Sequence, residues 1–279
     1  MSEYRHLLVK SYQGVQTITL NRPEKRNALC PLLMDELVSA LEQAARCECD
    51  VVVLTGAGSA FCAGLDMDNL ATMHAQTRED ARKDSERMAR LLLAIYRFPK
   101  PILAAVNGPA IAGGMALATL CDFTYATPDA RFAYTEVRLG YIPAIVATFL
   151  MRQMGEKRTR ELLLSGRILK AEEAQRMGLV TRVVPVGELH AEVKALAQTL
   201  RMNSPQAMKT VKQLLTQNNA KRLEAEIEAA IEANAEQHSS EDFREGVRAF
   251  FEHRKADWPS RHAEPSRHAQ LSQPAEPGR

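Results

Sequence analysis

The sequence predicts an α/β protein whose C-terminal part is entirely helical. Short apolar or β-branched runs alternate with helical patterns through about the first 200 residues, which indicates a sheet packed against helices. From Glu188 onward only helical patterns occur. With 279 residues, of which 46% are hydrophobic and 25% charged, the chain has the composition and length of a soluble protein with a large core.

The first elements expected are a pair of strands and a helix. Residues 7–9 and 15–20 are β-branched or alternate in hydrophobicity, and Gln13-Gly14 between them is a turn signal. After a polar loop, Pro31 opens an amphipathic helix over 32–45, since proline is tolerated in the first turn.

A buried strand and a glycine-rich loop follow. Residues 51–54 are all apolar, as in strands that are buried on both faces. Gly56, Gly58 and Gly64 then make a flexible backbone at the end of this strand, where ligands often bind in α/β folds. The charged segment 71–90 fits either a solvated helix or a mobile flap.

The segment 101–141 is the centre of the prediction. Residues 102–106 are strand-like, and the small residues at 112–114 lead into a helical pattern up to Leu120. A strand that turns through glycines into a helix points backbone N–H groups at one place. Such a cradle suits a phosphate or the oxyanion of a polarised carbonyl, and the nearby carboxylate of Glu136 could move protons beside it.

The remaining pattern completes the α/β part and adds a helical layer. The expected elements are strands 122–126 and 180–184 and helices 91–97, 145–154, 156–164, 205–216, 221–236 and 241–253. Gly155 separates the third helix from the second, and Ser204 is a good N-cap. We expect a core over 1–200, a helical trimerisation region over 201–258 and a disordered tail over 259–279.

Charge and cysteine usage exclude several classes of function. The 36 basic and 34 acidic residues nearly cancel and aromatic residues are only 5%, so we expect neither nucleic acid nor a membrane as a partner. The five cysteines are scattered, the N-terminus has no signal-peptide pattern, and we expect a cytoplasmic protein with reduced thiols. The histidines are not placed at metal-ligand spacing, so no metal is expected.

Each of these motifs also has a simpler explanation. A turn such as Ala112-Gly113-Gly114 is common where a strand packs closely on a helix, and it matches neither the P-loop nor the full dinucleotide pattern. Glu136 has Arg138 two residues away, and a surface ion pair between them would leave the carboxylate without a catalytic role.

Several segments, taken together, resemble the crotonase (enoyl-coenzyme A hydratase/isomerase) superfamily. The matching text is ITLNRPEKRNAL (18–29), VVLTGAGSAFCAGLDM (52–67), KPILAAVNGPAIAGGMALATLCDFTYATPDARFAYTEVRLGYIP (100–143), GRILKAEEAQRMGLVTRVVP (166–185) and FFEHRKADW (250–258). The resemblance implies a spiral of strand-strand-helix repeats with a C-terminal helical layer, usually assembled as trimers or hexamers. It also implies an acyl-coenzyme A substrate, with coenzyme A as part of the substrate and no separate cofactor.

The resemblance also implies roles for particular residues. The amides of Leu65 and Gly113 would hold the thioester oxygen, and Glu136 would be the acid/base. Positions implied near the thioester or coenzyme A are Lys25, Arg26, Ala28, Ala63, Gly64, Asp66, Gly114, Tyr141, Arg254 and Lys255. We further expect Phe61, Met67 and Tyr134 to line the pocket with Tyr141.

Two departures from the family pattern leave the reaction open. Related hydratases carry a second glutamate where this chain has Ala116, and some relatives use an aspartate where it has Ala144. The wording around Glu136 is similar to bacterial methylglutaconyl-CoA-type hydratases of acyl metabolism, which favours a hydro-lyase. A single glutamate equally suits a Δ3,Δ2-enoyl-CoA isomerase. The third alternative is a catalytically weak acyl-CoA-binding homologue.

Overall fold

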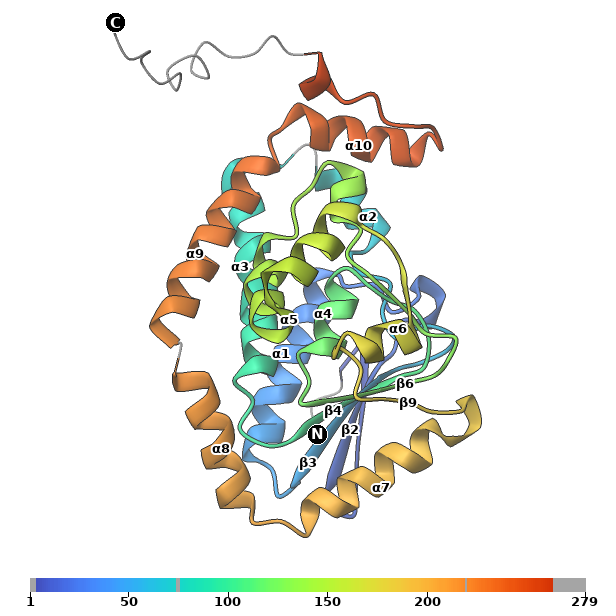
Figure 1. Ribbon diagram of the computed structural model, residues 1–279, viewed down its shortest axis with the longest axis vertical. Helices are drawn as coiled ribbons and strands as arrows, with labels where there is room; N and C mark the ends of the chain where they lie inside the picture. Colours follow the sequence, from blue (N-terminus) through green and yellow to red (C-terminus); the bar gives the residue numbers. More distant parts are fainter. Residues whose placement is uncertain (1–3, 74–75, 219, 263–279) are drawn as a thin grey trace, which may run out of the picture.

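The computed structural model describes residues 4–73, 76–218 and 220–262. These residues form two sheets with helices packed around them, so the predicted α/β class is confirmed (Figure 1). The larger sheet has the strand order β1-β2-β3-β4-β6-β9. Its strands are β1 (Leu7–Tyr12), β2 (Val15–Leu20), β3 (Val51–Gly56), β4 (Ile102–Val106), β6 (Phe123–Ala126) and β9 (Arg182–Val183). Only β1 and β2 pair antiparallel; the other neighbours are parallel.

A small second sheet and the helices complete the fold. The small sheet has the order β5-β7-β8, with β5 (Ala110–Ile111), β7 (Arg131–Ala133) and β8 (Leu169–Lys170). The helices are α1 (Pro31–Arg46), α2 (Met67–Met73), α3 (Arg78–Tyr96), α4 (Gly113–Thr119), α5 (Ala144–Ser165), α6 (Ala171–Arg176), α7 (Leu189–Arg201), α8 (Pro205–Gln217), α9 (Ala220–Gln237) and α10 (Glu241–Phe251). Short 3-10 turns lie at Pro23–Lys25, Glu136–Leu139, Val186–Glu188 and Pro259–Arg261.

The apolar run of β3 is explained by helices on both faces of the sheet. Val51 and Val53 pack in one cluster with the buried face of α7. Val52 and Leu54 point the other way, into the main core with α1 and α4. Successive side chains of a strand point to opposite faces, so a strand covered on both sides is apolar at every position.

The charged segment that the sequence left undecided is a helix from Arg78 onward. The Thr77 side chain accepts from the Asp80 amide while the Asp80 carboxylate accepts from the Thr77 amide, which is a complete capping box. The helix α3 then runs without a break to Tyr96, and its buried residues follow one face. Helix α5 is split at Gly155, as expected, because this residue has a φ of 75°.

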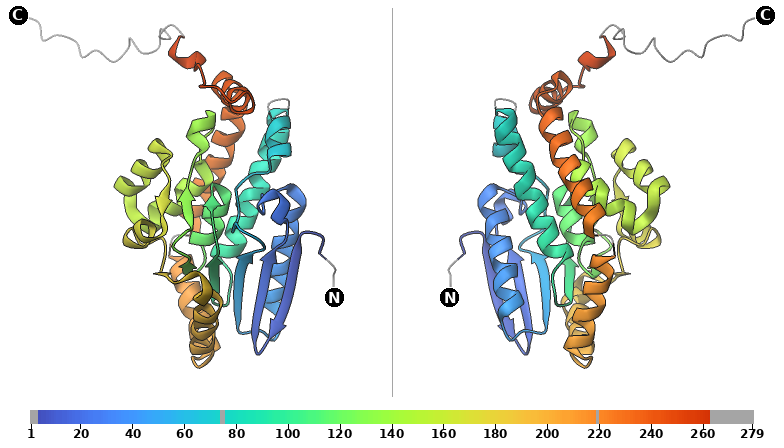
Figure 2. Two further views of the ribbon diagram at one scale, coloured as in Figure 1. Left: turned by 90° about the vertical axis from the view of Figure 1, so that its right-hand side faces the viewer. Right: turned by 90° about the vertical axis from the view of Figure 1, so that its left-hand side faces the viewer.

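The expected C-terminal helical layer is present, and its helix α9 packs into the main core. Leu223, Ile227 and Ile231 of α9 belong to the main apolar cluster, and α9 lies along α3 (Figure 1). Figure 2 shows α10 and the turn after it at the end of the molecule opposite α7. The boundary placed at residue 200 and the trimerisation role of 201–258 stay predictions.

The beginning of the expected tail is ordered. The Ser260 amide and hydroxyl both donate to the Asp242 carboxylate, which holds the turn Pro259–Arg261 against α10. Disorder was therefore wrong for these residues, because the prediction took account of composition and not of this cap. Residues 263–279 lie outside the described part. Within the described residues, no helix has the length and apolar character needed to cross a bilayer.

Candidate functional site

Two loops that leave the same edge of the large sheet run side by side. They follow β3 and β4, which are parallel neighbours, so both start from the strands' carboxyl ends. The Phe61 and Cys62 amides donate to the Pro109 carbonyl at 3.1 Å, and the Ile111 amide donates to the Cys62 carbonyl at 2.9 Å. This pairing brings the segment after Cys62 beside the segment that enters α4.

The two loops each offer one backbone N–H group without an acceptor. Among the described residues, no backbone hydrogen bond has the amide of Leu65 or of Gly113 as its donor. Each follows a residue with positive φ: Gly64 at 91° and Ala112 at 49°. The alanine is strained in this conformation, which costs on the order of 1–3 kcal/mol and is typical of functional sites. Both amide donors belong to residues that line one cavity.

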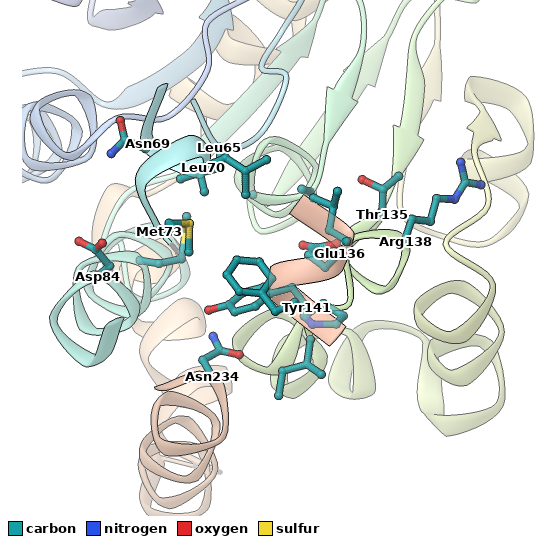
Figure 3. A pocket seen from close by; sticks show the side chains of 18 of the residues that line it. Leu65, Asn69, Leu70, Met73, Asp84, Thr135, Glu136, Arg138, Tyr141 and Asn234 are labelled. Carbon is teal, nitrogen blue, oxygen red and sulfur yellow. The ribbon is translucent and has the colours of Figure 1, made fainter. Parts of the chain in front are cut away.

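A hydrogen bond to the small sheet brings Glu136 to the same place. The Ala112 amide donates to the Ala133 carbonyl at 2.7 Å, which ties the entrance of α4 to the end of β7. Three residues later, Glu136 begins a 3-10 turn that is closed by the Tyr141 amide donating to the Glu136 carbonyl at 3.1 Å. Its side chain therefore leaves a well-defined backbone and lines the cavity with Leu65 and Gly113 (Figure 3).

The carboxylate of Glu136 is poised to change its protonation near neutral pH. Its Oε2 is buried and has no hydrogen-bond partner among the described residues. Burial raises the pKa of Glu136 from the ordinary 4.5 to about 7. The ion pair with Arg138 that the sequence left open is not formed within the described part of the chain, and Figure 3 shows the guanidinium pointing away from Glu136. A buried acid without a counter-ion is what proton transfer at neutral pH requires.

The cavity is large and mainly apolar. Its volume is about 620 Å³. Its apolar wall includes Leu70 and Met73 of α2 and Phe243 of α10, which pack in one cluster with Leu65 and Tyr141. Such a cavity can enclose an acyl chain while the amides and the carboxylate meet its polar end.

Tyr141 lies on the wall beside Glu136. Its ring centroid is 5.0 Å from that of Phe243 and 6.5 Å from that of His238. Burial raises the pKa of Tyr141 to about 12, although a hydrogen bond with Ser85 acts in the opposite direction. The hydroxyl therefore stays protonated and can donate a hydrogen bond.

The N-terminal basic residues predicted to hold coenzyme A, Lys25 and Arg26, lie outside the cavity. The Lys25 ammonium pairs with Asp68 at 2.9 Å on the surface. Arg26 has its carbonyl bonded to the Ala63 amide at 3.0 Å, and Ala28 is buried with its carbonyl bonded to Arg22. Of Lys25, Arg26, Ala28 and Ala63, only Ala63 lines the cavity.

Three further predicted residues have structural partners and do not line the cavity. The Asp66 carboxylate is buried and pairs with Arg22 at 2.6 Å. The Gly64 carbonyl accepts from the Leu29 amide at 2.7 Å. A Cβ on Gly114 would come within 2.2 Å of the Cys62 carbonyl oxygen, so this glycine allows the loops to approach each other. These three shape the backbone around Leu65 and Gly113, and a direct substrate contact is left as a prediction.

The two C-terminal basic residues, Arg254 and Lys255, lie in different places relative to the cavity. Arg254 lines the cavity and forms a two-bonded ion pair with Glu245, which also lowers the pKa of that carboxyl to about 2. Lys255 is exposed outside the cavity.

The prediction that Phe61 and Tyr134 line the pocket is wrong, while that for Met67 and Tyr141 is confirmed. Phe61 and Tyr134 are almost completely buried, and both point into the core. Tyr134 directly follows β7, and an aromatic residue at a strand end can face either side; Phe61 lies in the loop after β3, where the sequence does not show its direction.

The two positions at which related enzymes carry a further acid, 116 and 144, are alanines here, so neither adds a second carboxylate to the cavity. Ala116 is 2% exposed on the core side of α4. Ala144 lines the cavity at the first position of α5. Within the described residues, the other acid on the cavity wall is Asp84, whose oxygens accept from Gln76 at 2.9 Å and Arg87 at 2.8 Å. No group of three or more metal-ligating side chains occurs in this part of the chain.

Sequence reasoning missed the contribution of two distant helices. Ser85 and Met88 of α3 and Asn234 of α9 all line the cavity. The spacing of Ala81, Ser85 and Met88 places them on one helical face, a signal that was present within the charged segment. Asn234 could not be found in this way, because only the tertiary packing of α9 brings it to the cavity.

Known proteins share both the sequence pattern and the fold. The family model described as enoyl-CoA hydratase/isomerase matches residues 10–261. A Thermus thermophilus protein whose name assigns it to the enoyl-CoA hydratases is 41% identical over 244 residues, which is 86% of this chain and 95% of that protein. Enoyl-CoA delta isomerase 2 of Rattus norvegicus is 33% identical over 224 residues, 80% of this chain and 57% of that protein.

A solved structure gives the same assignment. The crystal structure of an enoyl-CoA hydratase/isomerase from Pseudoalteromonas atlantica T6c superposes with a TM-score of 0.81 at 34% identity. The match covers 91% of this chain and all of that one. The expected spiral architecture is therefore confirmed.

Proposed function

The chain belongs to the enoyl-CoA hydratase/isomerase family, and from its site we propose that it adds water to, or removes water from, 2-enoyl-CoA thioesters. The observation that carries this proposal is the convergence of two amides without acceptors and one carboxylate with a buried, unpartnered oxygen on a single apolar cavity. The Thermus relative carries a hydratase name and is matched over almost its full length, which supports hydration as the type of reaction.

The two amides act on the thioester oxygen. With that oxygen between the Leu65 and Gly113 N–H groups, electron density can move onto it from carbon 3 through carbon 2. Each donor contributes about 3–4 kcal/mol to the enolate, judged from oxyanion holes in general. The positive-φ residues before each donor hold the N–H directions in advance, so little reorganisation is needed during the reaction.

The carboxylate of Glu136 carries both proton transfers. It takes one proton from water as the water oxygen bonds to carbon 3, and the C2=C3 electron pair moves into the enolate. The protonated carboxyl then returns that proton to carbon 2, and the thioester carbonyl re-forms. The balance is one water added across one double bond. No second acid is needed, which fits an alanine at position 116.

The finer substrate and assembly assignments are part of the proposal. Lys25, Arg26 and Lys255 are exposed cations that can meet the phosphates of coenzyme A outside the acyl cavity. A cytoplasmic location and a homotrimer or hexamer are what we expect for this enzyme.

An isomerase is the second candidate, and the lone carboxylate favours it. A Δ3,Δ2 shift removes a proton from carbon 2 and returns it to carbon 4, which one base can do from one face of an enolate. The rat relative carries an isomerase name.

One experiment separates these two candidates. Purified protein is supplied with a 2-enoyl-CoA or a 3-enoyl-CoA in water enriched in ¹⁸O, and the ultraviolet absorbance of the conjugated thioester is followed with mass analysis of the product. A hydratase removes the absorbance of the 2-enoyl substrate and places ¹⁸O in the product. An isomerase raises absorbance from the 3-enoyl substrate without ¹⁸O. Acyl-CoA binding without turnover of either substrate contradicts both and leaves the binding homologue.

A further inference from the structure

A second polar region lies on the cavity wall, formed by elements far apart in the chain. Ser85 comes from α3, Tyr141 from the turn after Glu136, and Asn234 from α9. Ser85 interacts with the Tyr141 hydroxyl and lowers its pKa, although burial raises it overall. The Tyr141 ring lies 6.5 Å from that of His238, one helical turn beyond Asn234, and Figure 3 shows Tyr141 and Asn234 on the same side of the cavity.

The Asn234 side chain is buried without a partner. It is 6% exposed, and its Oδ1 has no hydrogen bond. Among the described residues, the Asn234 side-chain nitrogen has no hydrogen-bond acceptor either. A buried amide left unpaired costs about 1–3 kcal/mol, and native proteins seldom retain one without a use.

The surroundings indicate the chemistry of the missing partner. The Asn234 amide offers a donor and an acceptor, and the Tyr141 hydroxyl offers a further donor. The negative charge of Asp84 on the same wall disfavours a carboxylate, although Arg87 partly balances it. Apolar side chains make up most of the rest of the wall. The fitting group is uncharged, donates and accepts hydrogen bonds, and is carried on an apolar chain.

We propose that Asn234, supported by Tyr141 and Ser85, forms a subsite for a hydroxyl group on the acyl chain, beyond the carbons that react. This assignment rests on the proposed function, because it takes the cavity to hold an acyl-CoA. It narrows the substrate class from enoyl thioesters in general to those with a distal, uncharged polar group. An alkyl chain of the same length would leave the Asn234 amide unpaired.

Binding measurements test the subsite without requiring turnover. Calorimetry compares hexanoyl-CoA and octanoyl-CoA with their ω-hydroxy derivatives and with the matching ω-carboxylates. We expect one ω-hydroxy thioester to bind the wild-type protein about tenfold more tightly than its alkyl counterpart. Equal affinities would overturn the subsite, because they mean that water satisfies the amide. Tightest binding of the ω-carboxylate would overturn it as well.

Three variants locate the preference. In Asn234→Leu the preference for the hydroxyl is lost and the alkyl thioester binds more tightly than in the wild type. Tyr141→Phe removes one hydroxyl, keeps the ring and reduces the preference for the hydroxy thioester. This variant tests the subsite if Asn234→Leu does not fold. Asn203→Leu changes an exposed asparagine outside the cavity and keeps the wild-type preference. A preference unchanged in both Asn234→Leu and Tyr141→Phe contradicts the assignment.

The outcome separates this inference from the proposed reaction. A hydroxyl preference in a protein that turns over no enoyl thioester supports the subsite and contradicts the hydratase. Turnover of an enoyl thioester without a hydroxyl preference supports the proposed reaction and contradicts the subsite. No binding of any acyl-CoA overturns both.

Discussion

The Nη2 atom of Arg22 lies 2.6 Å from the Oδ2 atom of Asp66, and both side chains are almost removed from solvent. Asp66 directly follows Leu65, whose amide N–H has no acceptor, and the Asp66 amide donates to the Leu29 carbonyl at 3.0 Å. The buried ion pair therefore holds the backbone that presents the Leu65 amide, the first of the two proposed oxyanion donors. Removing one partner leaves the other charge buried without compensation.

Asp66→Ala is expected to lower the free energy of unfolding by about 3–5 kcal/mol, the usual cost of an orphaned buried charge. Urea unfolding followed by circular dichroism measures it. The control is Asp68→Ala, which breaks the exposed Lys25 pair and leaves stability nearly unchanged. Equal effects of the two variants would contradict the structural role given to Asp66.

Glu136→Gln is expected to lower kcat by about 10²–10⁴-fold, because the amide cannot transfer protons. The side chain keeps its size, so the affinity for a saturated acyl-CoA should stay within a few-fold of the wild type. Steady-state kinetics and calorimetry measure the two effects. Glu172→Gln, at an exposed site on α6, is the matched control with wild-type activity. Retention of kcat within tenfold in Glu136→Gln would exclude the proposed acid/base.

The pH profile of hydration follows from the pKa of Glu136, which burial raises to about 7. The reaction starts with the deprotonated carboxylate, so kcat/KM should rise with pH and level off above about pH 7. A profile that is already level at pH 4.5, the ordinary pKa of a glutamate, would show that the free enzyme does not use a buried acid.

The Glu136 carboxyl should also make the unfolding free energy depend on pH: this energy should fall as pH rises, whereas kcat/KM rises. Between pH 4.5 and about 7 the unfolded chain has released the Glu136 proton while the folded protein still holds it. The folded state therefore binds more protons there, and this contribution to stability is lost as pH rises. We expect the unfolding free energy of the wild type, relative to Glu136→Gln, to fall across this interval. A difference that is constant with pH would contradict the raised pKa.

Adjacent glycines at the start of α4 should respond differently to alanine. A Cβ on Gly114 would lie 2.2 Å from the Cys62 carbonyl oxygen, whereas a Cβ on Gly113 would meet the ends of Leu29 and Met88 at 3.0 and 3.2 Å. Backbone cannot move aside as side-chain ends can, so Gly114→Ala should cost about 1–3 kcal/mol. Gly113→Ala should cost much less. Thermal unfolding of the two variants tests the order, and a reversed order would contradict the loop packing.

Much of the fold could be predicted because local signals and tertiary demands agree. The strand patterns at 15–20, 51–54 and 102–106 all became strands, and Gly155 divided a helix as expected. The last strand is shorter than the predicted 180–184, since only Arg182 and Val183 pair with β6. An edge strand pairs with a neighbour on one side only, so the sequence indicates its ends less clearly.

The meeting of Leu65, Gly113 and Glu136 at one cavity could also be predicted, but only part of the cavity wall could. Leu65, Gly113 and Glu136 stand in motifs whose local backbone determines their geometry. Asn234 is separated by almost 100 residues from Glu136, and its place depends on how α9 packs on α3. Asp66 illustrates another limit: an acid in a motif loop is typical of a ligand contact, whereas the structure shows it paired with Arg22.

The division of the site between chain segments bears on how such enzymes diversify. The groups proposed for chemistry lie between residues 65 and 136, whereas Asn234 belongs to a C-terminal helix that supplies neither the amides nor the base. Arginines of α3 and of its C-cap pair with glutamates along α9 and align the two helices from outside. Substitutions of cavity-facing residues on α9 can therefore alter substrate specificity during evolution while the proposed reaction is conserved.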